Sequence, residues 1–68
     1  MTEDLDYLLN SEPFVPFRII LTSGTTYNVT SPFQLVRQEA QFTFFFAKSD
    51  RQAIFRASQL VVIETLPD

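Results

Sequence analysis

Residues 42–47 read Phe-Thr-Phe-Phe-Phe-Ala and form the most strand-like stretch of the chain. Aromatic residues favour β-strands, in which successive side chains point to opposite faces of the sheet. Alternation therefore places the first, third and fifth residues of this stretch on one face, which we expect to be a core face. Phe45 falls on the other face. It is exposed there unless the helix, a curled strand or a partner chain covers it, and the local pattern leaves these alternatives open.

The segment before this strand predicts a β-hairpin over Phe17 to Val29. Phe17 to Leu21 is rich in β-forming residues, Ser23-Gly24 is a turn signal, and strand character resumes at Tyr27. Gly24 is the only glycine in the sequence. We therefore expect it at the tight turn, where a positive φ is needed.

The remaining elements complete a mostly β (α+β) domain over residues 1–68. We expect a short helix within 1–11, a proline-rich connector over 12–16, and a small β-barrel over 17–66. The helix has an apolar stripe of leucines, and its first turn is acidic. The segment 60–64 is apolar enough to be buried on both faces or to pair with another molecule. Turn signals every eight to twelve residues indicate five or six short strands that close or nearly close into the barrel.

Length and charge limit the kind of protein that this chain makes. Its 68 residues allow one folding unit with a small core and no disulfide, because the sequence has no cysteine. The net charge is −3, but residues 13–63 hold all five cations against two carboxylates, a net of +3. The acidic first residues are unlike a basic targeting segment, and no apolar run is long enough to span a membrane. The expected location is the cytoplasm.

Residues 12–32 read Glu-Pro-Phe-x-Pro-Phe-Arg-Ile-x-Leu-Thr-Ser-Gly-x-x-Tyr-x-Val-x-x-Pro. This opening resembles that of a group of small uncharacterised bacterial proteins, common in planctomycetes. The resemblance implies a five-stranded antiparallel barrel preceded by a helix, similar in layout to Sm-like and SH3-like barrels. It implies no activity, so it assigns no functional residue to this chain.

An enzyme is not expected from these residues. The sequence has no histidine for acid–base catalysis and no cysteine nucleophile. Glu39 and Asp50 flank opposite ends of the Phe-rich strand, too far apart to act on one bond. We predict no catalytic residue, no cofactor and no metal site, since the acidic residues at the helix start are typical of dipole stabilisation.

Two binding functions remain. The favoured hypothesis is a module that contacts another protein or a second copy of itself, as a homo-oligomer, because an apolar edge or face on so small a domain is commonly covered by a partner. The alternative is binding of RNA or single-stranded DNA through the basic body of the barrel, with aromatic rings stacking on bases. The candidate surface residues for these functions are Phe45, Val61, Tyr27, Tyr7 and Arg56.

Overall fold

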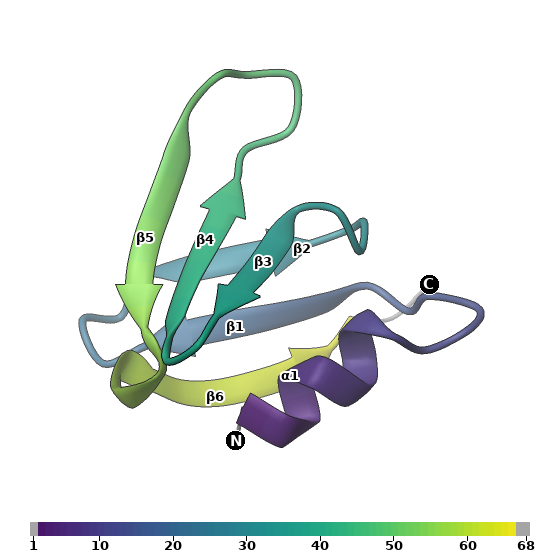
Figure 1. The fold of residues 1–68 in the computed structure, drawn as a ribbon, viewed down its shortest axis with the longest axis horizontal. Coiled ribbons are helices and arrows are strands. Elements are labelled where there is room, and N and C mark those ends of the chain that lie inside the picture. Colours follow the sequence, from purple (N-terminus) through teal and green to yellow (C-terminus); the bar gives the residue numbers. More distant parts are fainter. Residues whose placement is uncertain (1, 67–68) are drawn as a thin grey trace.

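A computed structural model describes residues 2–66. The chain begins with helix α1 and continues through six strands and one short 3₁₀ helix (Figure 1). Their bounds are α1 Thr2–Leu9, β1 Phe17–Leu21, β2 Thr26–Val29, β3 Leu35–Gln38, β4 Gln41–Phe45, β5 Gln52–Arg56, η1 Ala57–Gln59 and β6 Leu60–Thr65. None of the helices in this part of the chain is long and apolar enough to cross a membrane.

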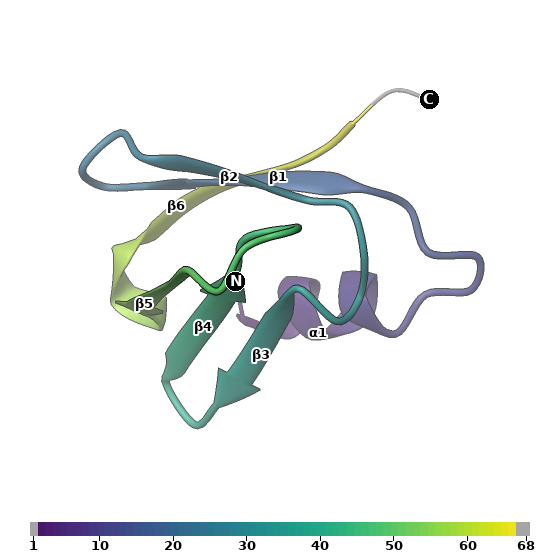
Figure 2. The ribbon, with the colours of Figure 1, turned by 90° about the horizontal axis from the view of Figure 1, so that it is seen from above.

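The strands form two separate antiparallel sheets of three strands each. One has the order β2-β1-β6 and the other β3-β4-β5. Figure 2 shows them as two layers with the chain crossing between them at each side. The expected five-stranded closed barrel is therefore wrong: residues 2–66 form six strands and no closed barrel.

The segment between β2 and β3 explains this difference. Pro32 lies there and has no N–H to donate to a ladder. The side-chain oxygen of Gln34 accepts hydrogen bonds from the N–H groups of Thr30 and Ser31, at 2.8 and 3.1 Å. These bonds satisfy the backbone within a turn. The chain thus ends one strand and starts another, where a barrel would need one bent strand shared by both sheets.

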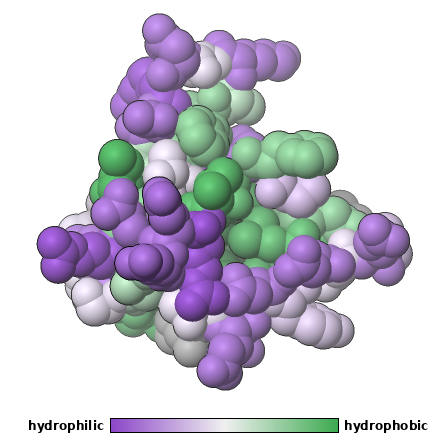
Figure 3. Space-filling view, viewed as in Figure 1, coloured by the Kyte–Doolittle hydropathy of each residue, from purple (hydrophilic) through white to green (hydrophobic). Residues whose placement is uncertain are grey.

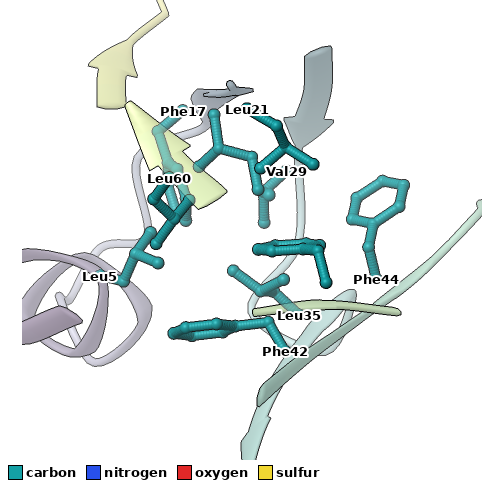
Figure 4. Packing of buried hydrophobic residues seen from close by; sticks show 10 residues of the cluster. Leu5, Phe17, Leu21, Val29, Leu35, Phe42, Phe44 and Leu60 are labelled. Carbon is teal, nitrogen blue, oxygen red and sulfur yellow. The ribbon is translucent and has the colours of Figure 1, made fainter. Parts of the chain in front are cut away.

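The core lies between the two sheets and follows from strand alternation. In β1 every second residue is buried, and in β4 the buried residues are Phe42 and Phe44. Figure 4 shows these side chains meeting between the layers. The buried cluster consists of Leu5, Phe17, Ile19, Leu21, Val29, Leu35, Phe42, Phe44, Phe55 and Leu60.

Helix α1 closes one end of the core. Leu5 is fully buried and points from α1 into the cluster, and Leu8 and Leu9 pack beside it (Figure 4). Asp6 forms an ion pair with Arg37 of β3, whose side chains are 41% and 38% exposed. An ion pair that is so accessible to water contributes at most about 1 kcal/mol, whereas a buried leucine contributes several times more. Leucine burial therefore holds α1 in place.

We expect Leu5→Ala to lower the free energy of unfolding by about 2–5 kcal/mol, because it opens a cavity in the core. Asp6→Asn should lower it by less than about 1 kcal/mol. Urea unfolding of the two variants measures both values. A larger loss for Asp6→Asn than for Leu5→Ala would show that the ion pair, and not the leucine, anchors the helix.

Gly24 occupies the turn between β1 and β2 with a φ of +89°, which confirms the prediction. A Cβ built at this position meets no atom within 4 Å. The requirement for glycine is therefore a matter of backbone conformation and not of space.

Gly24→Ala should accordingly cost about 1 kcal/mol, or roughly 4–8 °C in Tm for a domain of this size. Gly24→Asn is the matched control and should cost less, because asparagine tolerates the left-handed region better than alanine. Thermal unfolding followed by circular dichroism measures both. Equal stability of Gly24→Ala and the parent would mean that the turn relaxes to a negative φ.

Candidate interaction surface

The outer face of the sheet β3-β4-β5 carries apolar side chains that point away from the core. The register places Val36 opposite Thr43, and Thr43 opposite Ile54, so that these three form one row across the strands. Phe45 lies on the same face, one row along, opposite Gln52. We call Val36, Thr43, Phe45 and Ile54 the apolar sheet face.

The apolar sheet face is open to solvent. Ile54 is 59% exposed, Val36 48% and Phe45 39%. Figure 3 is drawn from the side on which β3, β4 and β5 lie in front, and it shows hydrophobic surface there, interrupted and bordered by polar side chains. The second sheet packs against the inner side of β3-β4-β5, and α1 lies beside β3, so neither of them covers the outer face.

Glutamines and one cation surround the apolar sheet face. Gln38 lies opposite Gln41, and Gln41 lies opposite Arg56, in the row beyond Thr43. These side chains, with Glu39 and Ala40, line a shallow depression at the β3–β4 turn. At the other end, the Gln34 C=O accepts a hydrogen bond from the Phe45 N–H at 2.7 Å. The surface is thus an apolar centre with a largely neutral polar rim, which is the general anatomy of a protein contact site.

Tyr27 lies on the inner side of the molecule. Its ring centroid is 4.9 Å from that of Phe44, 5.9 Å from that of Phe55 and 6.0 Å from that of Phe46. These separations fall in the range of favourable aromatic pairs. Tyr27 therefore packs between the sheets and does not present its ring for an external contact.

The five residues predicted as surface candidates divide among four places. Phe45 and Arg56 share the outer face of β3-β4-β5. Tyr27 packs in the aromatic cluster, and Tyr7 is exposed on α1. Val61 is exposed on β6, where the register with β1 shifts between Ile20 and Leu21, so it is the extra residue of a β-bulge.

Sequence reasoning missed Val36 and Ile54. Each of them stands next to another apolar residue in a short strand, and the sequence does not show which of the two neighbours is buried. In the structure Leu35 and Phe55 are the buried ones, and Val36 and Ile54 are exposed. The predicted alternation of the Phe-rich strand assigned Phe45 to a face opposite Phe44. Extending that alternation to the neighbouring strands requires the strand register, which only the structure supplies.

Comparison of this chain with protein-family models, curated proteins and solved structures finds no match. Among residues 2–66, no group of three or more acidic side chains is arranged to hold a metal ion. The surface is therefore assigned from its geometry.

Phe44 and Phe45 are adjacent in sequence and lie on opposite faces, which makes them a matched pair. Phe44→Ala should lower the free energy of unfolding by about 3–5 kcal/mol, and Phe45→Ala by about 1 kcal/mol or less. Urea unfolding measures both. If Phe44→Ala does not fold, Phe44→Leu must still lose more than Phe45→Leu. The reverse order would place Phe45 in the core.

Proposed function

We propose that this chain is a non-enzymatic protein-interaction module and that its apolar sheet face is the contact surface. The observation that carries the proposal is the juxtaposition of Val36, Phe45 and Ile54, which are 39–59% exposed on one sheet face. Burying apolar surface yields roughly 25 cal/mol per Å², so a partner that covers these side chains gains affinity from each of them. The lack of histidine and cysteine in the sequence supports the non-enzymatic part.

The residues of the rim favour a protein over a membrane or a strongly charged ligand as the partner. A binding site for a polyanion needs a cluster of cations, whereas here Arg56 is accompanied by neutral glutamines. Glutamine side chains both donate and accept hydrogen bonds, so they suit the mixed polar groups at the edge of a protein contact.

The second candidate function is binding of RNA or single-stranded DNA. It is supported by Phe45 and Arg56 on one face, at opposite ends of the β4–β5 ladder, because an exposed ring can stack on a base and a cation can contact a phosphate. Three of the other four cations are engaged elsewhere. Arg18 pairs with Glu64, Arg37 pairs with Asp6, and the Arg51 guanidinium lies 4.6 Å above the Phe46 ring. This distribution gives the phosphate backbone few partners, and we therefore rank nucleic acid second.

Site-specific photocrosslinking in cells of the organism that makes the protein tests the proposal. A benzophenone amino acid replaces Phe45 or Ile54 in turn, and Val61 and Tyr7 serve as exposed control positions on other surfaces. We expect protein adducts at positions 45 and 54 that mass spectrometry identifies as the same partner, and much weaker adducts at positions 61 and 7.

Two results would contradict the proposal. Adducts at positions 45 and 54 that nucleases remove would favour the second candidate. Adducts confined to position 61 or position 7 would move the contact surface to β6 or to α1.

A further inference from the structure

Strand β5 has an open edge whose backbone groups are not used by its own sheet. Just beyond the last β4–β5 pair, the Ala57 N–H donates a hydrogen bond to the Ala40 C=O at 2.7 Å. Bonded and non-bonded pairs alternate in an antiparallel ladder, so Phe55 directs its N–H and C=O toward β4. The corresponding groups of Gln52 and Ile54 point away from β4, toward the edge of the sheet.

The other sheet edges carry features that discourage pairing. Beside β3 lies α1, held by the ion pair between Asp6 and Arg37 (Figures 1 and 2). Strand β6 has the bulge at Val61 and the charged side chain of Glu64, and β2 is only four residues long. Bulges, charges, covers and short strands are the usual protection of edges. Strand β5 has no bulge and no proline, and Arg56 at its end is its only charge.

The apolar sheet face of one copy is smaller than a standard protein interface, and pairing at β5 would enlarge it. Strands of four, five and five residues present a face of roughly 230 Å², from the strand spacing and the rise per residue. A standard protein interface buries about 800 Å² on each partner. A second copy added at β5 doubles the continuous face to roughly 460 Å².

We propose that two copies of this chain pair antiparallel through β5, about a two-fold axis at Ile54, and join their sheets into one of six strands. This proposal goes beyond the proposed function: the second copy pairs through the strand edge, and the apolar sheet face of both copies stays free for the partner proposed above. The row of Val36, Thr43 and Ile54 then continues directly into the Ile54 row of the second copy. The joined apolar sheet face is the surface that the dimer presents.

The strand is complementary to itself in this arrangement. The two Ile54 residues exchange two backbone hydrogen bonds, and each Gln52 N–H reaches the Arg56 C=O of the other copy. The Arg56 N–H already donates to the Gln59 side-chain oxygen at 2.8 Å, so it needs no further partner. Each Arg56 side chain lies opposite a neutral Gln52, so like charges do not face each other. The acidic helix α1 lies on the other side of the sheet from β5 (Figure 1).

Single cysteines test the register, because the natural sequence has none. About the two-fold axis, residues at position 54 lie with Cα atoms about 5.5 Å apart, within the range that a disulfide spans. Residues at position 52 lie about 14 Å apart, which is too far. In a glutathione redox buffer we expect Ile54→Cys to form a disulfide-linked dimer and Gln52→Cys, the matched control, to stay monomeric.

Sedimentation velocity over a hundredfold concentration range supplies the second measurement. Ile54→Pro removes the outward N–H without breaking a β4–β5 bond, and we expect it to raise the dimer dissociation constant about tenfold or more. Phe45→Ser changes the face but leaves the edge intact, so it should change this constant by less than about threefold.

Three results would overturn the pairing through β5. One is a parent protein that stays monomeric over the whole concentration range while both cysteine variants form disulfides equally. In that case the crosslinking experiment still decides the proposed function. Another is a dimer that Phe45→Ser dissociates and Ile54→Pro does not, which means face-to-face packing and leaves the proposed function standing. The third is preferential disulfide formation by Gln52→Cys, which means a different register.

Discussion

A series of stacked aromatic rings joins the sheets of this domain. The Phe55 ring lies 5.5 Å from that of Phe42 and 5.9 Å from that of Tyr27, with interplanar angles of 15° and 9°. Tyr27 comes from β2, whereas the two phenylalanines come from β4 and β5, so this series of rings connects one layer to the other. Offset aromatic pairs contribute about 0.5–1.5 kcal/mol each beyond their burial. Because the layers are joined by side chains and not by a continuous ladder, each sheet keeps two edge strands, and β5 is the edge that has neither a cover nor a bulge.

The same packing explains why an apolar face remains outside. Residues 2–66 form two layers and have, besides the three-residue 3₁₀ helix η1, only α1 to cover anything else. That helix is used at the end of the core, where Leu5 is fully buried. A domain of this size buries a smaller fraction of its surface than a larger one does. The side chains of Val36 and Ile54 are thus left exposed by the geometry of a one-sided sheet, and the contact proposed above would bury them.

The two edges of the sheet β3-β4-β5 differ in charge and in whether another element covers them. The acidic helix lies beside β3 and is tied to it by Asp6 and Arg37. Strand β5, at the opposite edge, carries neutral side chains up to Arg56. Negative charge therefore gathers on the side that is already covered, and the neutral edge remains open. Association through β5 keeps the acidic helices of two copies apart, which limits their mutual repulsion.

The sequence by itself determined the elements that depend on local chemistry. The acidic first turn and the leucine stripe predicted the helix, the single glycine predicted the positive φ at position 24, and the alternation of residues 42–46 predicted a core face with Phe45 opposite to it. Only the tertiary structure decided that the strands form two sheets and that Phe45 shares a face with Val36 and Ile54. The physical reason is that alternation fixes which side of its own strand a residue occupies. The register between strands, and the turn around Pro32 that separates β2 from β3, depend on contacts between distant segments.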